Sequence, residues 1–364
     1  MARRGQRTLA GAVARRQGAA HTSTNWVLGG ARGLLGLLAL AYLGGWIGYG
    51  GLLALGLTQT GWPSLVRELT LYLFVPLVPL LLAALALRAV FAIVCLAPVA
   101  ALFLTLYGGR LLPPVVRGAS AGADGFTVLT FNAGGNAGGG RPAPLLRAVQ
   151  AVAADLVALQ EVPPDTRPIV RAELAARYPY VATVADAPDL LVLSRFPLGA
   201  GEALPLRQGA FDGFQVRIDI AGRPVQLVNL HLARPGYRLR WRGGLVPTVR
   251  AFDPRQRDAQ VAELVGYLGT LAQPRLVVGD FNASEWSYTH ALLARELHDS
   301  FAAAGWGFGH TYPSHVVWGS WEASVPLLRI DYVFHSAELV ALHAAVGPDG
   351  GSDHLPVAAR LAFR

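Results

Sequence analysis

Three long apolar runs within the first 107 residues constrain the fold of this chain more than any other feature. They cover residues 34–57, 69–87 and 89–107, and none of them contains a charged residue. A helix needs about 20 apolar residues to cross about 30 Å of hydrocarbon. Each run is close to that length. The sequence therefore predicts a transmembrane region with three helices over residues 34–107, preceded by a basic segment over residues 1–33.

Two alternatives to three spans stay open on the sequence. The first run is an uncleaved span or a signal peptide, although it is longer than a signal core and lacks a clear cleavage site. Only Arg88 separates the second run from the third. If these two runs formed one broken span, the chain would cross twice and its orientation would invert.

Charge is divided unevenly along the chain. Residues 1–117 hold ten arginines and one acid, Glu68, whereas the remainder is nearly neutral. A near-neutral second part does not resemble a protein that coats nucleic acid.

The composition of the whole chain also limits its class. Only 15% of the residues are charged, against about 25% in ordinary soluble domains. The single cysteine, Cys95, excludes an intramolecular disulfide framework and a cysteine-rich zinc site.

The positions of the arginines predict the orientation. Six arginines precede the first apolar run, Arg88 lies between the second and third, and Arg67 in the first loop is offset by Glu68. Arginine-rich short loops stay in the cytoplasm. We therefore expect a multi-pass protein of the cell membrane, with a cytoplasmic N-terminus and with residues after 108 outside the cytoplasm.

Residues 125–364 read as one α/β domain, joined to the apolar region by a linker over residues 108–124. Apolar strand-like segments recur through this part, with helical stretches between some of them. Many strands with few helices fit two packed sheets flanked by helices. The predicted strands cover residues 126–131, 156–159, 190–193, 214–220, 225–230, 276–278, 330–334 and 357–361.

Polar residues stand at the ends of several of these predicted strands. Strand ends can deliver side chains into a common cleft. The set contains carboxylates, amides and two histidines, which suits one hard cation and a charged substrate. The segments are Thr130-Phe131-Asn132, Leu159-Gln160-Glu161, Ser194-Arg195-Phe196-Pro197, Asn229-Leu230-His231-Leu232, Gly279-Asp280-Phe281-Asn282, Arg329-Ile330-Asp331-Tyr332 and Ser352-Asp353-His354.

In this order the segments resemble the motifs of the endonuclease/exonuclease/phosphatase superfamily, which has the deoxyribonuclease I-like fold. The resemblance covers residues 125–364 and implies a four-layer α/β sandwich with two central mixed β-sheets. It also implies hydrolysis of phosphoester bonds with Mg²⁺, Mn²⁺ or another divalent cation. With the apolar runs added, the chain resembles the membrane-anchored subset of that superfamily with N-terminal transmembrane helices, some of which are associated with glycopeptide-antibiotic resistance.

The resemblance assigns the metal and the attacking water to two groups of residues. Asn132 and Glu161 match the family's metal ligands, and Asp353 is expected to assist as a ligand or through water. Asp280 and Asn282 match the D-x-N pair that positions and polarises the water and the scissile phosphate.

The histidines are assigned by the same resemblance. His354 matches the terminal histidine that contacts the phosphate or moves a proton, and Asp331 matches the aspartate that orients it. His231 matches the second active-site histidine, where AP endonucleases usually have tyrosine. The resemblance therefore points away from repair of abasic sites.

Arginines supply the predicted substrate contacts. Seven of them lie within residues 233–257 beside one acid, Asp253. One interpretation is an arginine lid that grips phosphate or lipid headgroups, and the other is a solvated loop. We assign Arg234, Arg238 and Arg240 to substrate. Arg195, in the S-R-x-P motif, is also assigned to substrate, although a structural role is favoured. Arg257 and Gln260 are interpreted as serving only the helix that they begin.

The sequence thus predicts a membrane-anchored, metal-dependent phosphoesterase acting outside the cytoplasm. Its substrate is a phosphomonoester, phosphodiester or diphosphate, and a lipid-linked phosphate is favoured because an anchor holds the cleft near the bilayer. One alternative is an extracytoplasmic nuclease that acts on DNA, and the other is a non-catalytic binding or sensor module. Protein partners are not predicted.

Overall fold

A computed structural model describes residues 2–112, 125–134, 142–206, 212–242, 246–318 and 321–364. Its backbone divides into two compact units. The first contains residues 1–57 and 70–108, and the second contains residues 58–69 and 109–364. The short segment between the first two apolar runs therefore belongs to the same unit as the predicted α/β domain.

The first unit is helical. It contains α1 (Ala2–Ala54), the 3₁₀ helix η1 (Thr70–Phe74), α3 (Leu77–Ala86) and α4 (Val90–Tyr107). Among the described residues, Trp26–Ala54 and Val90–Arg110 are long and apolar enough to cross a membrane. A third candidate joins residues 61–68 to residues 70–86, with a bend of 74° between the two parts. This bend lies at the start of the predicted run over residues 69–87, and the run itself is divided into η1 and α3. Residues 2–33 are part of α1.

Small and polar side chains hold these helices together. A Cβ atom on Gly36 of α1 would lie 2.9 Å from the Phe91 ring of α4, so only glycine allows this approach. Arg32 Nε donates to the Leu87 carbonyl over 2.7 Å. The hydroxyls of Tyr49 and Thr70 are hydrogen-bonded at 2.6 Å.

The second unit contains two six-stranded sheets. Each sheet has one parallel pair, β1–β2 or β7–β10, and its other neighbours are antiparallel. The first sheet has the order β15 (Leu339–Val346), β16 (Val357–Phe363), β1 (Gly125–Asn132), β2 (Leu156–Gln160), β4 (Ala187–Ser194), β3 (Tyr180–Val184). The second has the order β11 (His298–Asp299), β14 (Asp331–His335), β10 (Arg275–Asp280), β7 (Arg223–His231), β6 (Asp212–Ile220), β5 (Glu202–Ala203).

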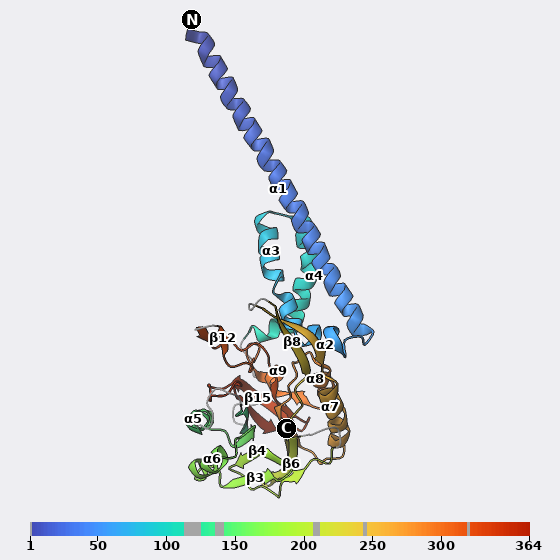
Figure 1. Cartoon of the computed structure of the whole chain (residues 1–364), viewed down its shortest axis with the longest axis vertical. Coiled ribbons are helices and arrows are strands. Elements are labelled where there is room, and N and C mark those ends of the chain that lie inside the picture. The colour runs from blue at the N-terminus through green and yellow to red at the C-terminus, as the bar shows by residue number, and fades with distance from the viewer. Residues whose placement is uncertain (1, 113–124, 135–141, 207–211, 243–245, 319–320) are drawn as a thin grey trace. The chain divides into compact units, whose positions relative to one another are not determined.

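Alternating side chains pack these sheets into four layers. In β10, Leu276 and Val278 belong to the core between the two sheets, whereas Val277 belongs to the core under the helices. Helices α5 (Pro142–Val152) and α6 (Thr166–Leu174) cover the outer face of the first sheet. Helices α7 (Arg255–Leu268) and α8 (Tyr288–Leu293) cover the second. Figure 1 shows the two helix pairs on opposite sides of the strands. The predicted sandwich with two mixed sheets is confirmed.

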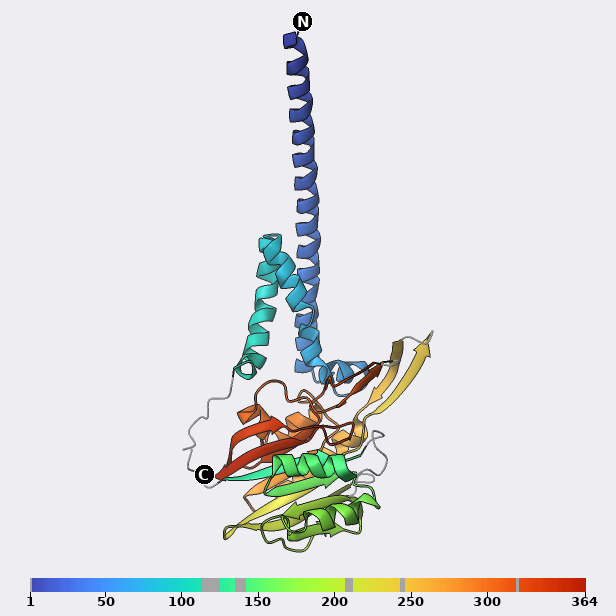
Figure 2. The same ribbon diagram turned by 90° about the vertical axis from the view of Figure 1, so that its left-hand side faces the viewer.

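The arginine-rich segment forms regular structure. Residues predicted as a lid or solvated loop form a hairpin of β8 (Gly236–Arg242) and β9 (Val246–Asp253), followed by α7. Figure 2 shows this hairpin projecting from the sandwich. Helix α2 (Gly61–Glu68) packs against β9. Smaller elements complete the unit: η2 (Gly108–Arg110), α9 (Ser300–Ala304), β12 (Val316–Trp318) and β13 (Trp321–Ala323).

Candidate active site

The two parallel strand pairs bring the predicted site residues to one edge of the sandwich. Asn132 ends β1, and Glu161 directly follows β2. His231 ends β7 and Asp280 ends β10, where they are register partners. Asp331 begins β14 on the other side of Asp280. The carboxyl ends of parallel strands share an edge, so residues distant in sequence meet there.

The backbone around Asp280 has an unusual shape. Gly279 has a φ of +144°, and a Cβ atom there would lie 1.9 Å from the Leu230 carbonyl oxygen. Only glycine permits this approach. Glu161 and Asn282 have φ values of 49° and 48°, which side chains other than glycine rarely adopt. Backbone strain of this kind concentrates at functional sites.

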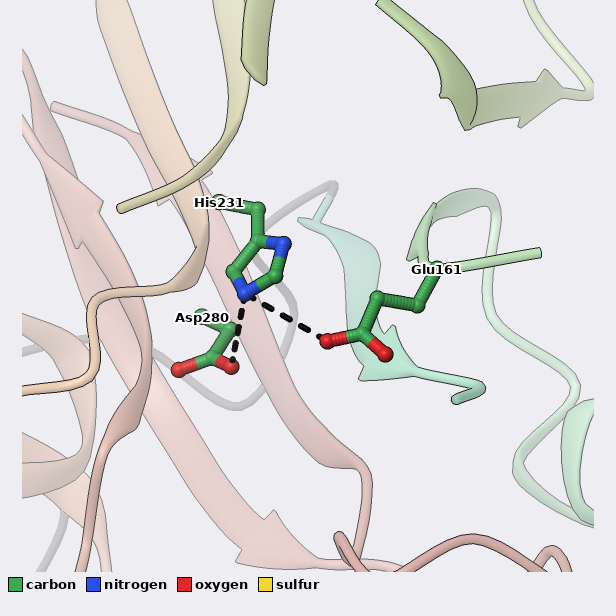
Figure 3. A group of neighbouring side chains, drawn as sticks. All are labelled: Glu161, His231 and Asp280. Atoms are coloured by element: carbon green, nitrogen blue, oxygen red, sulfur yellow. Dashed lines mark ion pairs between the residues drawn. The ribbon is translucent and has the colours of Figure 1, made fainter. Parts of the chain in front are cut away.

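Three of the predicted residues form a compact cluster. His231 Nε2 lies 3.4 Å from Glu161 Oε1 and 3.5 Å from Asp280 Oδ2. Figure 3 shows the imidazole pointing between the two carboxylates. The Asn132 amide nitrogen donates to Asp280 Oδ2 over 2.9 Å and to Glu161 Oε1 over 3.1 Å. Asn132 therefore joins residues of both sheets.

A second histidine, His354, lies near the same oxygen of Asp280 as His231. His354 Nδ1 lies 2.9 Å from Asp331 Oδ2, and His354 Nε2 lies 3.7 Å from Asp280 Oδ2. Burial acts to lower the pKa of His354, but the Asp331 and Asp280 carboxylates outweigh it and raise that pKa to about 10. The predicted contact between Asp331 and His354 is present, and it favours a positively charged imidazole.

Asn282 is held rigidly beside Asp280. Its backbone N–H donates to Asp280 Oδ1 over 2.8 Å, and its side-chain amide donates to the Leu232 carbonyl over 2.9 Å. Asp280 is fully buried. Its two carboxylate oxygens are thus fixed by the backbone and side chains around them.

The residues around Glu161 fit a divalent cation. Glu161 offers a carboxylate, and Asp353 Oδ1 is buried with no hydrogen-bond donor among the described residues. Ser352 donates to the Asn132 carbonyl over 2.8 Å, which places the loop carrying Asp353 at the end of β1. Oxygen-rich sites of this kind suit Mg²⁺ or Mn²⁺. Glu161, His231 and Asp280 offer ligand atoms within 4.8 Å of one another, so the cluster is suited to a metal ion. The assignment of Asn132, Glu161 and Asp353 as its ligands stays a prediction.

The predicted substrate-binding arginines lie in different surroundings. Arg234 Nη2 lies 2.9 Å from Glu161 Oε1, at the rim of the cluster. The side chains of Arg238 and Arg240 lie outside the described part of the structure. Arg195 is not brought to the site: it pairs with Asp155 at 2.6 Å, beside the start of β2 and thus at the opposite end of that strand. Its role here is structural.

Arg257 is a buried residue that supports the site. The sequence analysis interpreted it as serving only its helix. Arg257 Nη2 lies 2.7 Å from Glu68 Oε1, and its Nη1 donates to the Asn282 carbonyl. The other oxygen of Glu68 accepts from the Ser284 N–H over 2.7 Å. Arg257 and Glu68 thus form hydrogen bonds with the backbone of Asn282 and of Ser284, both in the turn after Asp280. The one available signal was that Glu68 is the only acid in the first 117 residues.

Comparisons with known proteins place this geometry in a family. The model of the Endonuclease/Exonuclease/phosphatase family matches residues 129–354. A comparison with curated proteins finds no match.

Several solved structures are similar to this chain. A protein described as an endonuclease/exonuclease/phosphatase from Bacteroides vulgatus is 14% identical, with a TM-score of 0.52 over 66% of this chain and 99% of its own. One from Beutenbergia cavernae is 21% identical, with a TM-score of 0.47 over 66% of this chain and 72% of its own. Sphingomyelinase C from Streptomyces griseocarneus is 18% identical, with a TM-score of 0.46 over 65% of this chain and 99% of its own.

The family match covers more than half of the chain and spans the whole cluster from Asn132 to His354. The four-layer sandwich is the fold expected for that family. The chain therefore belongs to the endonuclease/exonuclease/phosphatase family of phosphoester hydrolases.

Proposed function

We propose that this protein is a membrane-anchored phosphoesterase that uses Mg²⁺ or a similar divalent cation. The observation that carries the proposal is the position of Asp280, which is fully buried and lies within 3.7 Å of both His231 and His354. A carboxylate held between two imidazoles beside a candidate metal site is equipped to handle the protons of an attacking water.

Each group of site residues has its own role in the proposed hydrolysis. Asn132, Glu161 and Asp353 would hold the cation, which neutralises charge on the phosphate oxygens when bound. Asp280 orients the water and accepts its proton as the water oxygen attacks phosphorus. The P–O bond to the leaving group then breaks. Asn282 and the imidazoles of His231 and His354 stabilise the additional negative charge of the transition state.

The placement of α2 supports a membrane topology. Residues 58–69 belong to the catalytic unit, so they lie on the same side of a membrane as residues 109–364. Residues 70–108 would then cross an even number of times. Helix α4 supplies one crossing, and η1 with α3 supplies the other. With the arginine-rich N-terminus in the cytoplasm, the catalytic unit lies outside it.

A lipid-linked phosphate or diphosphate is the favoured substrate, because an anchored enzyme meets lipid phosphates at the bilayer surface. DNA is the second candidate, and the hairpin of β8 and β9 favours it through its four arginines, Arg238, Arg240, Arg242 and Arg250. A non-catalytic binding module is disfavoured, since each catalytic position expected from the family motifs is filled.

The decisive experiment offers both substrates to the purified full-length protein in Mg²⁺. A polyprenyl diphosphate and duplex DNA are tested in parallel, beside Asp280→Ala. We expect cleavage of the lipid and its loss in the variant. Cleavage of DNA alone, with steep salt dependence, would identify a tethered nuclease. No hydrolysis of any phosphoester would contradict the proposal.

A further inference from the structure

A groove is lined both by active-site residues and by apolar side chains. Its volume is about 180 Å³, and its lining includes Arg234, Asn282 and His354. All of its lining residues belong to the catalytic unit. The groove is therefore continuous with the chemistry rather than a separate cavity.

Much of the remaining lining is hydrocarbon, beside the buried ion pair of Glu68 and Arg257. The apolar side chains are those of Leu65 of α2, Leu69 directly after it, Phe252 of β9, Leu328 and Ile330. Four of these five side chains are partly exposed, and Ile330 is buried. Partly exposed aliphatic groups gain free energy when a ligand removes them from water.

The groove lining combines two kinds of chemistry. Arg234 supplies positive charge, and its Nη2 lies 2.9 Å from Glu161 Oε1 of the catalytic cluster. The apolar side chains supply aliphatic and aromatic carbon. This combination matches a phosphate anion that is covalently joined to a hydrocarbon chain.

We propose that this groove binds the first carbons of such a chain, so that the substrate is an amphiphilic phosphate ester or diphosphate. The inference rests on the proposed phosphoesterase function and deepens it. Complete ligand pockets usually have volumes of about 300–1,000 Å³. A groove of about 180 Å³ therefore accommodates the part of the chain next to the phosphate and leaves the rest outside.

Helix α2 gives an independent reason to expect a lipid here. It supplies Leu65, and its two ends are joined by short stretches of chain to α1 and to η1 with α3, which are apolar. A nucleobase is the rival occupant, because Phe252 and Tyr237 are aromatic and bases stack on aromatic rings. The aliphatic wall of Leu65, Leu69 and Leu328 favours the hydrocarbon.

The test compares substrates with one head group and different chains. Full-length protein in lipid nanodiscs is given isopentenyl, geranyl and farnesyl diphosphates in Mg²⁺, and bis-p-nitrophenyl phosphate serves as a chainless reference. We expect kcat/KM to rise by about tenfold from the five-carbon to the ten-carbon chain. Little further increase is expected at fifteen carbons, because the groove is short.

Two variants of groove residues test whether the groove causes the dependence of kcat/KM on chain length. Leu65→Ala and Leu328→Ala are expected to reduce the ratio of ten-carbon to five-carbon kcat/KM by threefold or more. The matched control is Val66→Ala, one position along α2 and absent from the groove lining, which should keep the wild-type ratio. Equal melting temperatures of the three variants would exclude a folding defect as the cause.

The outcomes separate this inference from the proposed function. Hydrolysis of the chainless reference with no dependence on chain length would overturn the groove assignment and leave the phosphoesterase standing. A chain-length dependence that survives in both groove variants would also overturn it. If the variants instead weaken cleavage of single-stranded DNA, the groove binds bases. No hydrolysis of any substrate would refute the proposed function itself.

Discussion

Glu68 and Arg257 form a buried ion pair between residues 189 positions apart, with 2.7 Å between Glu68 Oε1 and Arg257 Nη2. Arg257 is 1% exposed. The pair connects the segment between the first two apolar runs to the turn after Asp280, because Arg257 also donates to the Asn282 carbonyl. A loop between predicted membrane spans is thereby part of the catalytic unit.

Removing one partner of this pair should destabilise the catalytic unit. Glu68→Ala removes the nearer of two carboxylates that pair with the buried Arg257 and leaves Asp258, 3.3 Å from the same nitrogen. Breaking a buried pair typically costs about 3–5 kcal/mol, and the remaining partner favours the lower end of that range. We expect a fall in melting temperature of roughly 10 °C and a lower kcat, since Ser284 and Asn282 lose their anchor. Differential scanning fluorimetry and phosphoesterase assays measure the two effects.

The matched control is the pair of Arg255 and Asp253, whose atoms are 2.6 Å apart with largely exposed side chains. Exposed pairs contribute little to stability, so Asp253→Ala should melt close to wild type. Similar losses for Asp253→Ala and Glu68→Ala would show that burial of the Glu68 pair is unimportant.

Substitution of Asp280 and of Glu161 should separate proton transfer from metal binding. Asp280→Asn is expected to lower kcat by about 10²–10⁴-fold, the usual contribution of a general acid or base. Glu161→Gln should instead raise the Mg²⁺ concentration needed for half-maximal activity by more than tenfold, because a carboxylate ligand becomes a neutral amide. Mg²⁺ titrations of both variants distinguish the two defects.

The exposed carboxylate Asp186 supplies the control for these variants. Asp186→Asn should retain wild-type activity and Mg²⁺ dependence. Unchanged Mg²⁺ dependence in Glu161→Gln would remove Glu161 from the metal site.

His354 should stay protonated well above neutral pH in the metal-free protein. Burial lowers its pKa, but Asp331 and Asp280 raise it more strongly, to about 10. The unfolded value is about 6.5. The charge therefore stabilises the fold fully below pH 6.5, and this contribution disappears as the pH rises through 10. Histidine NMR titration measures the pKa directly.

Asp331→Asn removes the carboxylate that contributes most to raising this pKa. We expect the pKa of His354 to fall by at least one unit in the same NMR titration. An unchanged value would mean that Asp331 does not control the protonation of His354.

A second buried network should protect the fold in acid. Burial raises the pKa of Asp299, but Arg329 and His290 outweigh it and hold that pKa well below its usual range. Arg329 Nη1 lies 2.6 Å from Asp299 Oδ2. Stability from this carboxylate is present above about pH 4 and is lost only as the pH falls toward the depressed value.

Arg329→Gln should therefore move the acid-unfolding midpoint to higher pH, as followed by circular dichroism between pH 2 and 7. As a control we use Arg171→Gln, an exposed arginine on α6, which should unfold like wild type. An unshifted midpoint in Arg329→Gln would contradict the stabilising role of the pair.

Cysteine labelling tests the proposed topology. Gln59 and Asp186 are exposed positions of the catalytic unit, so Gln59→Cys and Asp186→Cys in a Cys95→Ser background should react identically. We expect both to react with a membrane-impermeant maleimide in intact cells. Labelling of both only after lysis would place the unit in the cytoplasm, and opposite results would place residues 58–69 on the other side of the membrane.

The sequence by itself determined the layers and most of the site. Each of the eight strands predicted from apolar segments is present. Strands such as β2 and β10 are buried on both faces, so each leaves a short continuous apolar run in the sequence. Strands such as β3 and β15 were missed, since only part of each is buried. The motifs around Asp280 and His354 were readable because glycine, aspartate and histidine stand at fixed positions relative to strand ends.

Only the tertiary structure decided how distant residues meet. It joined Glu68 to Arg257, placed Arg195 beside the start of β2, away from Glu161, because β4 runs antiparallel to β2, and paired the arginine-rich segment into a hairpin. Local patterns record which face of a strand or helix is buried. They do not record which other element covers that face, and ion pairs between distant segments depend on that packing. The apolar groove formed by α2 and β9 exists for this reason and could not be read from either segment alone.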